Sequence, residues 1–309
     1  MMYKNYKNQK GITLITLVVT IVVLIVLATI SINTVLGDNG IIGRAQKAKS
    51  SYQNSSASED ESMRQLANEI AKYDGTKTTE PVEMIDKNKS YVSYYADIDG
   101  DGIADGIIYA DLIESESEQW GGSDGTFSFE AIAGVKDYYI SKKDYQGEFG
   151  TRDMLRASGN GKDRFYVMAL EDVNPGESYS WYKLACGSGI PNYNDIVSDK
   201  FGTGKANTTA MLKEWNNGTY GVKEDNDMWG IIQDEVSKGW FIPSREEWAA
   251  FANNLAVYSE NYEVKCLLEK YWSSSIIANR GAYYISFTDN DILSDQIDSS
   301  YYVRLSITF

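Results

Sequence analysis

The chain has 309 residues, a net charge of −15 at neutral pH and a pI of about 4.5. The acidic residues are spread along the chain, so we expect no nucleic-acid partner held through its phosphates. The sequence contains no histidine, which excludes Ser-His-Asp and Cys-His catalysis and imidazole metal sites. The length allows one large domain or two of ordinary size.

The N-terminal residues have the layout of an export segment. Residues 1–11 form a short basic leader with Lys4, Lys7 and Lys10, and residues 12–36 contain no charged side chain. As a helix, this apolar stretch would measure about 37 Å at roughly 1.5 Å per residue, which is enough to span a bilayer. Basic residues before the span predict a cytoplasmic N-terminus and an extracellular remainder.

The junction "QKGITLITLVVTIVVLIVLA" resembles the start of type IV prepilins and pseudopilins. The resemblance implies cleavage after Gly11, so that the mature protein begins at Ile12. That family usually has Glu at the fifth mature position, where this chain has Thr16. The departure favours a tip or minor subunit, or a protein that stays in the membrane, over a bulk pilus subunit. A plain membrane anchor and a cleaved secretory signal are the alternatives.

A helical stalk is predicted over residues 41–73. Ser58 and Glu61 have the spacing of a capping box, and apolar residues recur on one helical face from Met63 onward. Asp74 and Gly75 end this pattern. Residues 74–87 are predicted to be a linker, which places the main domain boundary near residue 80 and a head domain over residues 88–309.

The segment "ADIDGDGIADG" contains aspartates at positions 1, 3, 5 and 9 of a calcium-loop frame: Asp97, Asp99, Asp101 and Asp105. Gly102 stands at the turn position. Oxygen ligands at alternate positions of a tight loop can converge on a hard cation. The acid expected at position 12 is replaced by Ile108, and strand patterns flank the loop. Calcium at these four aspartates is one interpretation, and a hairpin turn that binds no ion is the other.

Further along the head, "DRFYVMALEDV" and "YSWYKLACG" alternate as strands do. "FGTGKANTTAMLKEW" lacks the spacing of a phosphate-binding loop and is predicted to open a helix. Pro243 and Ser244 predict the start of another helix, with Glu246 and Glu247 in its first turn. Adjacent acids point about 100° apart on a helix, so we interpret them as first-turn charges rather than as a catalytic pair.

Four separated motifs occur in the head in this order: "GTGKANT", "GWFIPSREEWAAFA", "YWSSS" and "YYVRLSITF". Together they resemble the C-type-lectin-like fold of the formylglycine-generating-enzyme type, and more closely the variable proteins of diversity-generating retroelements. The resemblance implies an α+β head in which two helices pack on short mixed strands. The expected fold class is therefore α+β, with a long N-terminal membrane and stalk helix followed by a C-type-lectin-like domain.

In that family a reverse transcriptase rewrites adenine-containing codons at the 3′ end of the gene and spares framework positions. The resemblance implies that residues 272–309 are the variable segment, with Trp272 and Phe287 among its framework. The residues between framework positions are then the expected ligand-binding set: Ile276, Ile277, Asn279, Arg280, Tyr284, Ser286, Asp289, Asn290, Ser294, Asp298, Ser299 and Tyr301. A lectin-fold loop of low constraint is the alternative.

These observations predict a surface-displayed, pilin-like anchored binding protein of adhesin or receptor type. Its expected partner is a macromolecular ligand on another cell, a phage or a host surface. The alternative is a minor pilin or pseudopilin with a structural role, whose partners are other pilins. We expect no enzyme, because enzymes of the sibling fold need reactive cysteines and this chain has only Cys186 and Cys266. These two form one disulfide or are both buried thiols.

Overall fold

The computed structural model describes residues 19, 21–23, 83–113, 117–120, 125–128, 131–183, 195–219, 223–278 and 281–309. Residues 19 and 21–23 are helical. The cleavage site at Gly11 and Ile12, the stalk over 41–73 and most of the linker lie outside this set. The chain divides into two compact units, Met1–Thr79 and Glu80–Phe309, and every β-strand of the described residues belongs to the second unit. In the part of the chain described, no helix is both long and apolar enough to cross a bilayer.

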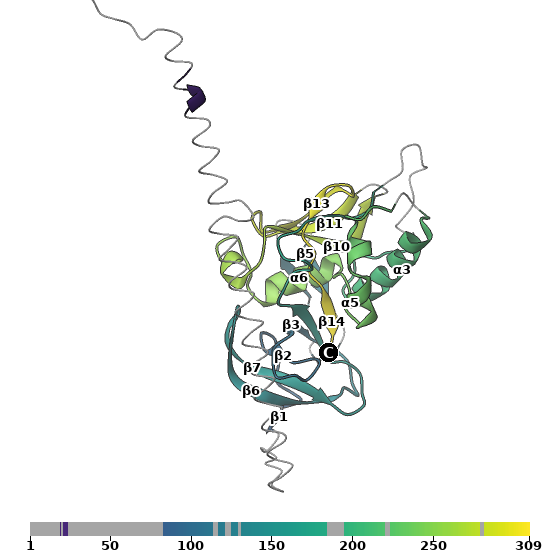
Figure 1. The fold of residues 1–309 in the computed structure, drawn as a ribbon. Helices are drawn as coiled ribbons and strands as arrows, with labels where there is room; N and C mark the ends of the chain where they lie inside the picture. The colour runs from purple at the N-terminus through teal and green to yellow at the C-terminus, as the bar shows by residue number, and fades with distance from the viewer. Residues whose placement is uncertain are drawn as a thin grey trace, which may run out of the picture. The chain divides into compact units, whose positions relative to one another are not determined.

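The centre of this unit is a seven-stranded sheet with the order β1-β6-β7-β2-β3-β8-β14 (Figure 1). Neighbouring strands are antiparallel except β2 and β7, which are parallel. The strand bounds are β1 Glu83–Met84, β2 Tyr95–Ala96, β3 Gly106–Asp111, β6 Asp137–Gly147, β7 Gly150–Ser158, β8 Phe165–Ala169 and β14 Ser306–Thr308.

The central strands of this sheet are buried on both faces. In β3, Ile107 contributes to one core cluster and Ile108 to another. In β8, Met168 and Val167 divide in the same way. Because successive side chains of a strand point to opposite faces, a sheet covered on both sides needs continuous apolar runs. The runs "GIIYAD" and "FYVMA" meet this need.

A second, three-stranded sheet has the order β10-β11-β12, and two strand pairs, β4-β5 and β9-β13, complete the β structure of the described residues. Four α-helices and one 3-10 helix accompany them. The bounds of these elements are β4 Ser117–Trp120, β5 Gly125–Ser128, β9 Tyr179–Ser180, α3 Gly204–Asn217, α4 Met228–Ile231, α5 Gln233–Ser237, α6 Arg245–Asn254, η2 Glu263–Lys265, β10 Lys270–Ala278, β11 Gly281–Ser286, β12 Asp291–Gln296 and β13 Ser300–Tyr301.

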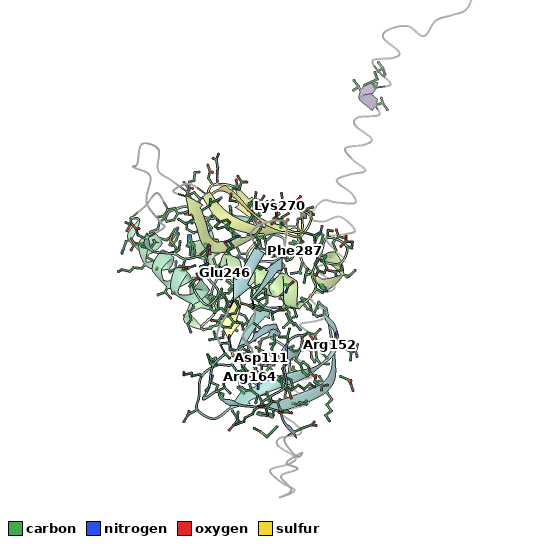
Figure 2. The ribbon with its side chains drawn as sticks, turned by 180° about the vertical axis from the view of Figure 1, so that it is seen from behind. Asp111, Arg152, Arg164, Glu246, Lys270 and Phe287 are labelled. Carbon is green, nitrogen blue, oxygen red and sulfur yellow. The ribbon has the colours of Figure 1, made fainter. Side chains whose placement is uncertain are left out.

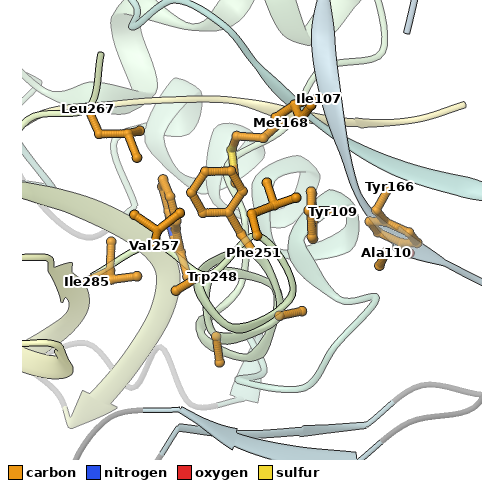
Figure 3. Close-up of a cluster of buried hydrophobic side chains, with 14 of the residues drawn as sticks. Ile107, Tyr109, Ala110, Tyr166, Met168, Trp248, Phe251, Val257, Leu267 and Ile285 are labelled. Carbon is orange, nitrogen blue, oxygen red and sulfur yellow. The ribbon is translucent and has the colours of Figure 1, made fainter. Parts of the chain in front are cut away.

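Helix α6 lies in the main core and packs against strands of both larger sheets. Figure 3 shows Trp248 and Phe251 among side chains from both sides, including Tyr109 and Met168 from the seven-stranded sheet and Ile285 from β11. Residues 246–252 are all buried. A helix enclosed on every side must be apolar or small around its whole circumference, which explains the alanines of "EEWAAFA".

The predicted fold class is wrong. The described unit is dominated by sheets, has four short α-helices rather than two, and contains no long helix. Two of its strands, β6 and β7, have 11 and 9 residues and form a hairpin that the sequence did not reveal. Much of β6 is exposed, so its residues carry no strong apolar alternation.

A buried carboxylate joins the start of α6 to the loop before α3. Glu247 accepts hydrogen bonds from the backbone N–H groups of Ser244 at 2.6 Å, Gly202 at 3.0 Å and Gly204 at 3.3 Å. A Cβ at position 204 would lie 2.2 Å from Glu247 Oε2, so glycine is required there. Glu246 is also buried and accepts from Lys200 Nζ. Both acids lie in the first turn of α6, but neither is a solvated charge.

Burial raises the pKa of Glu247 to about 7 from 4.5, although the hydrogen bonds to its carboxylate act in the opposite direction. The folded protein therefore keeps a proton on this group between about pH 4.5 and pH 7, where the unfolded chain has released it. The protonated Glu247 side chain therefore contributes its full stabilisation of the folded state below pH 4.5. This stabilisation is lost as the pH rises through 7. The nearby Tyr109 and Tyr166 have raised pKa values and titrate far above this window.

We expect Glu247→Gln to flatten the pH dependence of stability. Between about pH 5 and pH 8 the free energy of unfolding of the wild-type chain should fall by about 2–3 kcal/mol more than that of the variant. Denaturant unfolding at a series of pH values measures this difference. Glu246→Gln removes the adjacent buried carboxylate and is the matched variant against which the loss of stability at one pH is compared. If the free energy of unfolding depended equally on pH in the wild type and in Glu247→Gln, the raised pKa of Glu247 would be contradicted.

Candidate functional site

The structure separates the twelve predicted ligand-binding residues. Asn279 and Arg280 lie outside the described residues. Three of the others are buried: Ile276, Tyr284 and Ser286. Seven have exposed or half-buried side chains: Ile277, Asp289, Asn290, Ser294, Asp298, Ser299 and Tyr301. These three members of the expected ligand-binding set are therefore not accessible to a partner at the surface.

The buried positions have identifiable structural roles. Ile276 and Tyr284 belong to the core cluster that contains Trp272. Ser286 donates a hydrogen bond to Asp289 Oδ2 at 2.5 Å and closes the turn between β11 and β12. In the same turn Asn290 has φ of 53° and donates to Ser259 Oγ at 2.9 Å. Ser286, Asp289 and Asn290 thus shape the turn.

An aromatic patch, defined here as Trp272, Tyr284 and Tyr301, lies on one side of the three-stranded sheet. The Tyr301 ring centroid is 4.4 Å from that of Tyr284 and 4.5 Å from that of Trp272. Trp272 is fully buried and its Nε1 donates to the Tyr179 carbonyl at 2.7 Å. Tyr301 remains half-buried. The buried rings therefore support a ring that reaches the surface.

Three further residues surround this patch. The ammonium of Lys270 lies 5.7 Å from the Tyr284 ring centroid and 5.8 Å from that of Tyr301, within the range of a cation–π contact. Figure 2 shows Lys270 on the three-stranded sheet. Tyr301 Oη donates to Asp295 Oδ2 at 2.6 Å, and this bond lowers the pKa of Asp295. Leu293 pairs across the strands with Tyr284.

Lys270, Leu293 and Asp295 were not among the predicted residues. Lys270 precedes the segment in which variable residues were sought. Leu293 and Asp295 carry a signal that was available in principle, because residues two apart on a strand share a face. The register of β11 and β12 sets Leu293 opposite Tyr284, and Asp295 accepts the hydroxyl of Tyr301 from another strand pair, neither of which the sequence alone provided.

The structure brings together three of the four predicted calcium ligands. Carboxylate oxygens of Asp97, Asp99 and Asp105 lie within 4.8 Å of one another. Asp101 does not belong to this group, and its carboxylate accepts the Ile103 N–H at 2.7 Å. Burial, together with the neighbouring carboxylates, raises the pKa of Asp105 to about 6.

A cavity of about 850 Å³ opens beside these aspartates. Asp99 and Asp105 line it, as do Trp240 and Leu305 from the core side and Lys238 from the end of α5. Its other acidic lining residues are Glu171, Asp172, Asp234 and Glu235. The cavity is therefore lined by six acidic side chains and one basic side chain.

Of the two cysteines, Cys186 lies outside the described residues and Cys266 is exposed. The alternative in which both are buried thiols is therefore wrong for Cys266.

No family model matches the chain, and no curated protein matches it. The lectin-like and retroelement resemblances are thus without a matching family. One similar solved structure is a fimbrial protein from Bacteroides ovatus ATCC 8483, with a TM-score of 0.34 and 16% identity. The match covers 47% of this chain and 36% of that protein, little more than a third of its length.

We expect Trp272→Ala to lower the free energy of unfolding by about 3–5 kcal/mol. The change removes a fully buried ring, leaves the Tyr179 carbonyl without its donor and takes away the support of Tyr301. Ile277→Ala in the same strand is the matched control. Its side chain is 50% exposed, so its loss should cost less than about 0.5 kcal/mol. Chemical denaturation measures both, and similar costs would argue against a structural role for Trp272.

Proposed function

We propose that the protein is an exported binding protein that contacts a macromolecular partner through the exposed residues of its C-terminal sheet. The observation that carries this proposal is the division within residues 270–301 between side chains fixed in the core and side chains free at the surface. A rigid support with variable surface residues can change its specificity without losing its fold, because a packed core tolerates few changes and a solvated surface tolerates many.

The support is rigid because two buried indoles hold the backbone of β10 at Trp272 and Ser273. The indole of Trp248 donates to the Trp272 carbonyl at 3.1 Å. The indole of Trp181 donates to the Ser273 carbonyl at 2.8 Å. Sites built on strands held in this way lose little conformational entropy on binding.

The surface chemistry of the aromatic patch also favours binding. Tyrosine is enriched among residues that dominate interface energies, and a half-buried ring such as Tyr301 offers contact area at a low entropic cost. Lys270 and Asp295 place opposite charges beside it. Ser294 and Asp298 lie at the surface and supply adaptable hydrogen-bonding groups.

We further propose that codons for the exposed positions are rewritten by a retroelement, as the resemblance of the C-terminal motifs implies. Buried positions of the same segment are then excluded from useful variation. The basic leader and the apolar residues 12–36 support export, with prepilin-type cleavage after Gly11.

Sister sequences from one population test whether the exposed positions are diversified. We expect their differences to concentrate at Ile277, Ser294 and Asp298, while Ile276, Tyr284 and Trp272 stay constant. The locus should also contain a near-copy of the 3′ end that differs at adenines, beside a reverse-transcriptase gene. Differences distributed evenly over residues 80–309 would sink the proposal and favour a minor pilin with an assembly role.

Export has a separate test. Mass spectrometry of the protein isolated from its native source should identify Ile12, carrying a methyl group on its amine, as the first residue. A chain that retains Met1 would contradict prepilin-type processing while leaving the binding proposal untouched.

A further inference from the structure

Asp97, in the described part of the chain, is a buried aspartate with one unpaired carboxylate oxygen. It directly follows β2, and only 1% of its surface is exposed. Its Oδ2 accepts the Gly102 N–H at 3.2 Å and lies 3.7 Å from Arg156 Nε. Its Oδ1 is buried and has no hydrogen-bond partner. Buried carboxylate oxygens are nearly always paired, so this atom indicates that a partner is missing.

The unpaired oxygen belongs to the acidic cluster. Asp97, Asp99 and Asp105 bring carboxylate oxygens within 4.8 Å of one another. Like charges this close repel one another and disfavour ionisation. Arg156 lies on one side of the cluster and reaches Asp97 only at ion-pair distance. One arginine leaves the three carboxylates with an excess of negative charge.

The loop backbone is shaped to hold the three carboxylates together. Gly100 and Gly102 have φ of 85° and 89°, which residues with side chains rarely adopt. The Asp101 N–H binds Asp99 Oδ1 at 2.9 Å, and the Ile98 N–H binds Asp105 Oδ2 at 2.6 Å. These bonds fix one oxygen of Asp99 and one of Asp105 and leave further lone pairs for another partner.

We propose that Asp97, Asp99 and Asp105 bind one calcium ion, with Asp101 outside the ligand set. Carboxylate oxygens are the ligands of hard cations, and three carboxylates from one loop suit calcium better than magnesium, which keeps several waters and is usually bound by one or two carboxylates. Asp97 directly follows β2 and Asp105 directly precedes β3. The ion joins these two central strands across their connection. This site is independent of the proposed binding surface on β10–β12.

Calorimetric titration of the chelator-treated full chain with calcium chloride tests the proposal. We expect one ion per chain, and a melting temperature that rises by about 5–10 °C at about 100-fold excess over the dissociation constant. Asp99→Asn and Asp105→Asn should each weaken binding at least about tenfold, because ligand charge sets the affinity of such loops. Asp101→Asn is the matched control and should change the affinity less than about threefold. Circular dichroism before titration confirms that each variant is folded.

Three results would overturn the proposal. One is a wild-type chain that shows neither binding heat nor a shift in melting temperature with calcium. Another is an Asp101→Asn variant that loses as much affinity as Asp99→Asn, which would indicate a diffuse acidic surface rather than three ligands. The third is magnesium chloride that binds as tightly as calcium chloride, which would contradict the choice of ion.

Discussion

The buried carboxylate of Glu247 is the constraint on which the head depends. Its three backbone hydrogen bonds fix the start of α6 against the loop that opens α3. Neighbouring contacts extend the same network to β10, where the Ser274 N–H binds the Pro243 carbonyl at 2.8 Å and Ser275 Oγ binds the Ser198 carbonyl at 2.9 Å. Three motifs far apart in the sequence are thus one polar unit, which explains why serine, glycine and glutamate occupy buried positions.

A buried ion pair stabilises another part of the seven-stranded sheet. Arg164 and Asp111 form a bidentate pair at 2.7 Å and 2.8 Å, and Arg164 also donates to the Lys89 carbonyl (Figure 2). Removing one partner of such a pair leaves a buried charge uncompensated, which is strongly destabilising. The Arg164 pair and the Glu247 network hold different parts of the structure in place. The Arg164 pair holds the segment before β2 against the sheet, whereas the Glu247 network positions the sheet that carries the aromatic patch.

Local patterns predicted some of this structure and missed the rest for physical reasons. Ser244 and the acids after it predicted the start of α6, and the glycines before Lys205 predicted the start of α3. Strand β8 was also predicted, from alternation of its residues, although the structure buries them on both faces. The parallel pairing of β2 with β7 has no local signal, and Tyr284 is covered in part by Tyr301, which belongs to a different sheet. In the acidic loop, spacing alone could not show that Asp101 turns aside.

The last strand has a consequence for the way the gene can change. Strand β14 pairs with β8, and Phe309 exchanges backbone hydrogen bonds with Phe165 while its ring packs on Tyr138. The codons for β14 and Phe309 lie downstream of the codons for all the proposed binding residues. An out-of-frame insertion or deletion in the codons for residues 270–301 would replace β14 with unrelated residues and leave β8 without its partner on that side. The fold itself therefore accepts base substitutions in the codons for the exposed positions of this region and rejects frameshifts.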